Sequence, residues 1–186
     1  MLKNAGRILF TLLISITTFG LLFGAFFFYQ EKFINEPLTT FLDNSQVINE
    51  YQVLTRENSS FLILQLQNTD DLADEFQSFL KESGEILSKE DFTLEIYSNP
   101  SQNLLDFYQE IQPAIYEALT LGNFTELQDR LTAKQKEYKL KEVKLTINQD
   151  FLFLQLEDQD NYLYHIYNRS EQVVPKVINH LGSDIK

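Results

Sequence analysis

The longest apolar run of the chain lies at its start. Residues 8–29 contain no charged residue, and fourteen of them are Leu, Ile or Phe. A helix of this length reaches roughly 33 Å at about 1.5 Å per residue, slightly more than the ~30 Å hydrocarbon layer of a bilayer. Helices buried in soluble proteins are usually shorter and contain more polar residues. Because Leu, Ile and Phe all favour insertion into a bilayer, the pattern predicts a transmembrane helix over residues 8–29.

A cleaved signal peptide is the main alternative for this segment. Signal peptides combine a basic start with an apolar core of about 7–15 residues and a cleavage site flanked by small residues. The basic start is present, but the apolar run is longer, and the small residues Gly20, Gly24 and Ala25 are followed by further Phe. We therefore expect an uncleaved signal-anchor that holds the protein in the cell membrane.

Charges on either side of the apolar run indicate its orientation. Lys3 and Arg7 precede it. Lys32 is the single basic residue in residues 30–55, which follow it. Positively charged flanks remain in the cytoplasm. The sequence therefore predicts a cytoplasmic tip over residues 1–7 and an extracytoplasmic location for everything after residue 29.

Gly20 and Gly24 form a GxxxG pattern inside the predicted span. Two glycines four residues apart lie on the same helix face and let a second helix approach closely. Glycine is also common in membrane helices for other reasons. The pair is a candidate site of helix association, through which the chain would form a homodimer.

Beyond residue 29, apolar residues recur with the periods of strands and helices. Residues 30–50 are predicted to be a juxtamembrane connector with one short amphipathic helix, which Pro37 can open at its first position. In residues 51–186, alternation with period two predicts strands, and apolar spacings of three and four predict helices. The predicted strands are 51–55, 61–66, 92–97, 142–147, 151–156 and 162–167.

Capping and stop signals mark the first two predicted helices of this region. Thr69 precedes a helix that should end before Gly84. Ser101 precedes another that should end at Gly122, where glycine is the usual stop. Pro113 lies inside the second helix and should kink or restart it.

The C-terminal part contains a third helix and closely spaced strands. Asn123, with Glu126 three residues later, forms a capping-box pattern that opens the helix. Short turns between the last three strands predict antiparallel hairpins, and the apolar residues after Ser170 predict a short helix or a docked strand. Helices over one face of an antiparallel sheet give a single α+β domain over residues 51–186.

Charge and composition narrow the functional classes. Residues 30–186 contain all 27 acidic residues and 13 of the 15 Lys and Arg, a formal charge of 13 − 27 = −14. Such a surface repels nucleic acid, so we expect no nucleic-acid partner. The chain contains no Cys, which excludes disulfides, thiolate metal sites and a thiol nucleophile. An exported domain without Cys is typical of a bacterial envelope protein rather than a disulfide-stapled secreted one.

Candidate chemistry is sparse. Residues 30–186 contain no HExxH, GxSxG or phosphate-binding glycine loop, and the pair Asp158 and Asp160 lacks the further ligands of a calcium loop. We therefore predict no catalytic, cofactor-binding or metal-binding residues. The strongest candidate binding face lies on the strand predicted at 162–167, although a half-buried strand accounts for the same residues. It comprises Tyr162, Tyr164, His165 and Tyr167.

These features predict a single-pass membrane protein whose extracytoplasmic domain binds other membrane or envelope proteins, as a non-catalytic scaffold, assembly factor or regulator. The alternative is an extracytoplasmic sensor or binding domain for a small molecule, peptide or cation, which would use the face around His165 or the acidic loops. A hydrolase built on Asp, Glu and His165 is a third hypothesis. It requires the His165 ring to lie within hydrogen-bond reach of a carboxylate in a cleft.

Overall fold

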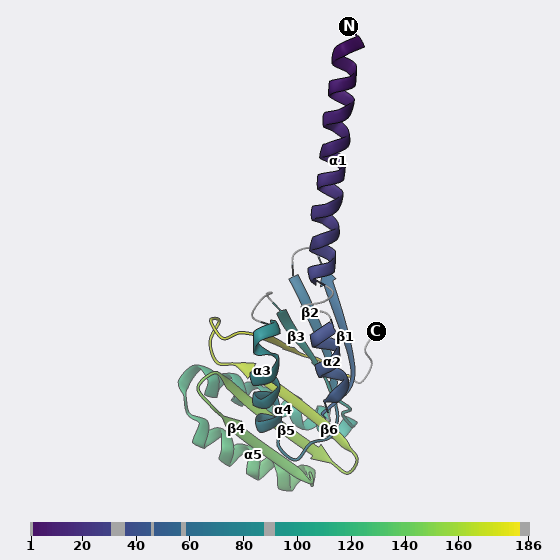
Figure 1. The fold of residues 1–186 in the computed structure, drawn as a ribbon. Helices are drawn as coiled ribbons and strands as arrows, with labels where there is room; N and C mark the ends of the chain where they lie inside the picture. The colour runs from purple at the N-terminus through teal and green to yellow at the C-terminus, as the bar shows by residue number, and fades with distance from the viewer. Residues whose placement is uncertain (1, 31–35, 46, 57–58, 88–91, 183–186) are drawn as a thin grey trace. The chain divides into compact units, whose positions relative to one another are not determined.

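The structure is a computed structural model that describes residues 2–30, 36–45, 47–56, 59–87 and 92–182 (Figure 1). The chain divides into two compact units, residues 1–44 and 45–186. The overall class is mixed α+β, with helices and two sheets. This agrees with the class predicted from the sequence.

The described residues of the N-terminal unit form two helices. α1 spans Leu2–Gln30, and its stretch Leu12–Tyr29 is long and apolar enough to cross a membrane, with none of it buried. Length and composition alone fit a signal sequence equally well. α2 spans Glu36–Asn44 and is the short helix expected in the connector. The predicted connector residues 31–35 lie outside the described part of the chain.

Seven strands in the described residues form two sheets. The first sheet has the order β1-β2-β3-β7, and the second has the order β4-β5-β6. The strands are β1 (Ile48–Arg56), β2 (Ser59–Leu66), β3 (Phe92–Tyr97), β4 (Glu142–Ile147), β5 (Phe151–Asp158), β6 (Asn161–Asn168) and β7 (Lys176–Asn179).

The prediction of one antiparallel sheet was wrong. The second sheet is antiparallel throughout, as the short turns indicated, but in the first sheet β3 pairs in parallel with both β2 and β7. The helix α3 (Leu72–Leu87) connects β2 to β3 and returns the chain to the same end of the sheet, which is what a parallel pair requires. β1 begins at Ile48, inside residues 30–50 that were predicted as a connector.

The segment after Ser170 resolves the choice between a helix and a docked strand. β7 (Lys176–Asn179) lies beside β3, with Val177 opposite Leu94 and Ile178 opposite Glu95. Two strands close in space but about 80 residues apart in sequence carry no local signal of their pairing. The apolar residues of the tail therefore indicated burial correctly, without indicating the partner.

Local signals placed both ends of the longest helix in the second unit. α4 (Gln102–Leu121) follows Ser101, whose hydroxyl accepts a hydrogen bond from the backbone amide three residues later at 3.3 Å. The helix ends at Gly122, which adopts φ 75°, a conformation that favours glycine. The predicted restart does not occur, because α4 continues through Pro113.

The ends of α3 differ from the prediction. Asp71, not Thr69, caps its start, because the Asp71 carboxylate accepts a hydrogen bond from the Asp74 amide at 3.0 Å. Lys144 also pairs with Asp71 at 2.6 Å and lowers the pKa of its carboxyl. The helix continues past Gly84 to Leu87, since an isolated glycine weakens a helix without ending it.

α5 (Phe124–Tyr138) follows Asn123, but the expected capping box does not form. The Asn123 side-chain amide donates to the Glu126 carboxylate at 3.1 Å instead of accepting from the backbone. Glu126 also pairs with Arg130 one turn later. The ion pair and the side-chain amide thus hold the carboxylate that a capping box would direct to the backbone.

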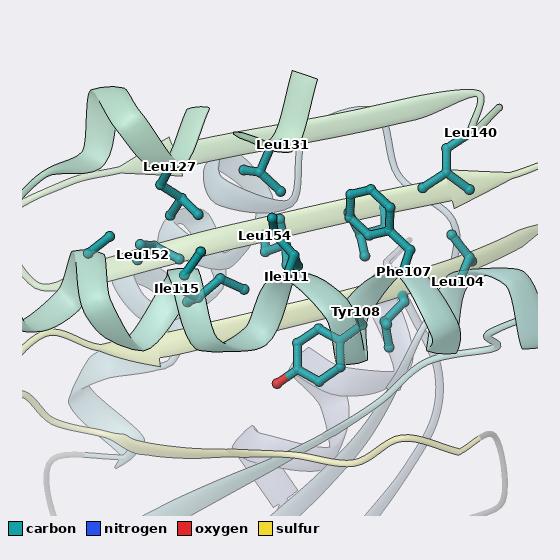
Figure 2. Close-up of a cluster of buried hydrophobic side chains, with 14 residues drawn as sticks. Leu104, Phe107, Tyr108, Ile111, Ile115, Leu127, Leu131, Leu140, Leu152 and Leu154 are labelled. Carbon is teal, nitrogen blue, oxygen red and sulfur yellow. The ribbon is translucent and has the colours of Figure 1, made fainter. Parts of the chain in front are cut away.

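The main core of the second unit lies between α4, α5 and one face of the second sheet. Figure 2 shows Phe107, Ile111 and Ile115 of α4 facing Leu152 and Leu154 of β5, all of them buried. Apolar side chains spaced three and four residues apart on α4 therefore pack against alternate side chains of β5. Burial of large apolar side chains is the principal source of stability here.

The opposite face of the second sheet packs against α3 and the loop before it. The Gln155 side chain donates to the Thr69 carbonyl at 2.7 Å and accepts from the Leu72 amide at 3.1 Å. The Tyr164 hydroxyl accepts from the Thr69 amide at 2.9 Å and donates to Asn68 at 2.9 Å. Two buried side chains of the sheet thus satisfy the backbone of the β2–α3 loop.

We expect Tyr164→Phe to lower the free energy of unfolding by about 1–3 kcal/mol, because the Thr69 amide and the Asn68 side chain lose their partner. Denaturant unfolding of the full chain in nanodiscs, followed by tyrosine near-UV circular dichroism, measures the change. Tyr116→Phe is the matched control, because Tyr116 is 54% exposed. Equal stabilities for the two variants would contradict the role assigned to Tyr164.

Candidate functional site

A cleft lies where α4, the end of β6 and β7 come together, with a volume of about 920 Å³. This is within the usual range of ligand sites, about 300–1,000 Å³. α4 contributes Tyr108, Gln112 and Tyr116, which are spaced by four residues and so share one helix face. The opposite wall is formed by the segment after β6 and by β7 itself.

Side-chain amides hold the wall formed by β7. The Asn179 amide bonds both the carbonyl and the amide of Ile166, each at 2.9 Å. Asn168 accepts from the Val177 amide at 2.9 Å and donates to the Pro175 carbonyl at 2.8 Å. Because β6 and β7 belong to different sheets, these two asparagines take the place of a backbone ladder between them. The side chains of Asn168 and Asn179 therefore hold β7 in place against β6.

The base of the cleft is a set of aromatic rings. The Tyr108 ring stacks on His165, with centroids 4.1 Å apart and planes 14° apart. Tyr167 lies beside His165, at 5.7 Å between centroids. The Tyr108 and Tyr167 hydroxyls are 2.8 Å apart, and Gln112 donates to the Tyr108 hydroxyl at 3.1 Å. Stacking and hydrogen bonds thus join residues of α4 and β6 in one aromatic cluster at the base of the cleft.

His165 is the chemically unusual member of this base. It is 3% exposed, and neither ring nitrogen has a hydrogen-bond partner among the described residues. Burial lowers its pKa to about 3, so the ring is neutral at physiological pH. Burial also raises the pKa of Tyr108 and Tyr167. The base therefore carries no charge. Both His165 ring nitrogens are also inaccessible to solvent, so the ring presents a carbon surface rather than a polar atom to the cleft.

Charged and apolar groups mark the rim. Lys176 and Glu171 are exposed. Arg169 also lines the cleft, but its guanidinium donates to the Asn148 carbonyl and lies 5.3 Å from the Phe124 ring centroid. Apolar surface comes from Tyr116 and Leu181, which are 54% and 47% exposed. The cleft thus has a neutral aromatic base with a mixed rim.

The structure divides the predicted binding face between the two sides of β6. His165 and Tyr167 face the cleft and α4. Tyr162 and Tyr164 are buried on the other side, where the Tyr162 hydroxyl donates to the Leu66 carbonyl at 2.6 Å. Alternation along a strand sends residues of opposite parity to opposite faces, so the four side chains do not form one surface.

Sequence reasoning missed the residues that other elements bring to the cleft. Tyr108 was assigned to the buried stripe of its helix, and Tyr116 was not singled out. Lys176 comes from a segment whose place beside β3 had no local signal. Gly20 and Gly24 lie in α1, and a Cβ built on either meets no other group within 4 Å. Their role in helix association stays a prediction.

The geometry does not meet the condition set for a hydrolase. Among the described residues, no carboxylate lies within hydrogen-bond reach of the His165 ring nitrogens. Asp158, considered above as part of a calcium loop, accepts hydrogen bonds from Ser101 and Asn103, both at 3.1 Å. In the part of the chain that the structure describes, no group of three His, Asp or Glu is arranged to hold a metal ion.

Comparison with known proteins adds no relative. No protein-family model, curated protein or solved structure matches this chain. The candidate function therefore rests on the chemistry and geometry of the cleft.

Proposed function

We propose that this protein is a membrane-anchored, non-catalytic binding protein whose extracytoplasmic domain holds a small molecule or peptide in the cleft between α4, β6 and β7. One observation carries the proposal. A cleft of about 920 Å³ combines an aromatic base with polar, charged and half-exposed apolar side chains at its rim. Convergent polar groups in a partly apolar cleft are the usual features of a ligand site.

The anchor is the second part of the proposal. The apolar helix α1 presents large side chains on all sides, among them Phe19 and Leu21, which are 68% and 70% exposed. A helix that is apolar all round is stable in hydrocarbon rather than in water. Lys3 and Arg7 favour a cytoplasmic N-terminus. Dimerisation through Gly20 and Gly24 remains an expectation of the sequence alone.

We expect the mature chain to remain in the membrane fraction after carbonate extraction, with its N-terminal residues intact by mass spectrometry. Protease added outside the cytoplasm should digest the domain after residue 45. A double variant, Leu13→Arg with Ile16→Arg, should weaken insertion, since each Arg costs roughly 2.5–3.5 kcal/mol near the bilayer centre. A soluble mature chain that begins after Gly20 would show a cleaved signal peptide instead.

The cleft favours the second function expected from the sequence, a binding domain, over a scaffold. A scaffold needs an extended surface, whereas the feature observed here is a concave site of ligand size. Binding to other membrane or envelope proteins therefore stays a prediction without a structural feature of its own. A peptide segment of such a protein is one ligand that the cleft would accept.

Photocrosslinking in intact cells tests the binding function. A photoreactive phenylalanine analogue at position 116, on the cleft rim, should give a defined adduct by mass spectrometry. The same analogue at Thr132, exposed on α5 away from the cleft, is the control. Adducts of equal yield from both positions, or from neither, would contradict a binding role for the cleft.

A further inference from the structure

The charge of the cleft is opposite to that of the domain around it. Residues 30–186 carry a formal charge of −14. Among the described residues, the charged ones that line the cleft are Arg169, Glu171 and Lys176, a formal charge of 2 − 1 = +1. The cleft is therefore a local exception on an acidic surface, which attracts an anion more than the rest of the domain does.

The two cations of the cleft differ in what they already bind. Arg169 donates to the Asn148 and Gln149 carbonyls and lies over the Phe124 ring, so its guanidinium ties the β4–β5 turn to the end of β6. Lys176 is exposed, and its side-chain ammonium has no hydrogen bond or ion pair with any described residue. Lys176 is thus the cation that remains available to a ligand.

Apolar side chains line the same cleft as this lysine. Tyr116 contacts the edge of Tyr167, with ring centroids 6.1 Å apart and planes 83° apart, and remains half exposed. Leu181 is also half exposed, and Val177 of β7 completes the apolar lining. Covering these groups releases water from apolar surface, which favours a ligand with an apolar body.

The neutral base limits the charge of the ligand. His165, Tyr108 and Tyr167 are all uncharged at physiological pH, so they neither add to Lys176 nor compete with it. Glu171 on the same rim disfavours an anion with two charges, such as a phosphate monoester.

We propose that the cleft binds an amphipathic monocarboxylate, with its carboxylate paired to the Lys176 ammonium and its apolar body covering Tyr116 and Leu181. This assignment rests on the proposed binding function and names its ligand class. A free organic acid and the C-terminal end of a peptide share this chemistry, and the test separates them.

Three probes with the same phenylpropyl body test the assignment: 3-phenylpropionate, 3-phenylpropanol and 3-phenylpropylamine. Titration into the full chain in phosphatidylcholine nanodiscs at pH 7 and low salt, with empty nanodiscs as the baseline, measures binding. We expect the carboxylate to bind about tenfold more tightly than the alcohol, the ratio of one charge-assisted hydrogen bond, and the amine to bind most weakly. Acetylated Ala-Phe, with a free or an amidated C-terminus, tests the peptide source.

Variants locate the interaction. Lys176→Gln should abolish the preference for the carboxylate and leave binding of the alcohol unchanged. Lys136→Gln removes an exposed lysine of α5 outside the cleft and should change nothing. Tyr116→Ala should weaken all three probes, because each shares the apolar body.

The outcomes separate this assignment from the proposed function. Equal binding of the three probes with a silent Lys176→Gln variant would overturn the carboxylate but keep the cleft as a binding site. If no carboxylate binds but position 116 gives a defined crosslink, the carboxylate assignment is also overturned and the cleft remains a binding site. Failure of both the probes and the crosslink would overturn the binding function itself.

Discussion

Replacing Phe107 by Ala should lower the free energy of unfolding by about 3–5 kcal/mol, the cost of removing a large buried aromatic side chain. Phe107 is fully buried between α4 and the second sheet, and its ring meets the edge of Tyr138 with centroids 5.5 Å apart. Because α4 is held on both sides by packed elements, the surrounding core cannot collapse fully into the space left behind. The loss therefore includes both the transfer of the ring and the cavity.

Denaturant unfolding of the full chain in nanodiscs, followed by the near-UV signal of the tyrosines, measures this loss. Leu121→Ala is the matched control, because Leu121 lies on the same helix and is 69% exposed. We expect the control to change stability by no more than about 0.5 kcal/mol. Similar losses for the two variants would mean that α4 does not pack on the second sheet as described.

Acidification from pH 6.5 to pH 4.5 should destabilise the domain by about 2–3 kcal/mol through His165 alone. The folded ring has a pKa of about 3, against an ordinary value of 6.5, because burial disfavours its charged form. Between these values the unfolded chain binds a proton that the folded chain does not. Stability is therefore complete above the ordinary pKa and falls by about 1.4 kcal/mol for each pH unit below it, until the folded pKa is reached.

The variant His165→Phe separates this effect from other acid-sensitive groups, because it keeps an aromatic ring that does not titrate. Asp71, whose pKa is lowered by Lys144, loses its stabilising charge only below its ordinary value of 3.8, and it does so in both proteins. The wild-type stability curve should therefore fall more steeply than that of the variant between pH 6.5 and 4.5. Parallel curves over this range would contradict the buried, neutral state of His165.

Secondary structure was predictable where the signal is local. β3 and β4 have the bounds predicted from alternation, and Ser101 and Gly122 mark the ends of α4 as expected. Each of these features depends on residues within one turn or one strand. The cap at Thr69 was wrong because its hydroxyl accepts from the Asp71 amide, and Asp71 caps the helix instead. The capping box at Asn123 was wrong because the Glu126 carboxylate binds the Asn123 side-chain amide and Arg130.

The candidate site was predictable only in part. His165 and Tyr167 were recognised on their strand, but strand alternation alone cannot show which helix covers them. Tyr116 and Lys176 reach the cleft from α4 and β7, elements separated from each other by more than 50 residues. Nothing in the neighbouring sequence reports such proximity, because it depends on how the two sheets and α4 pack.

Hydrophobic pattern and charge, read along the chain, were enough to determine the long apolar helix, its basic flank, the acidic domain and most of its strands and helices. These properties follow from side-chain type and backbone period, which are local. Tertiary structure alone decided the parallel pairing of β3 with β2 and β7, the division of the β6 tyrosines between two faces, and the cleft with Lys176 beside a neutral aromatic base. The physical reason is that strand partners and burial depend on packing between segments distant in sequence. The free energy of that packing depends on both segments together, so neither sequence alone predicts it.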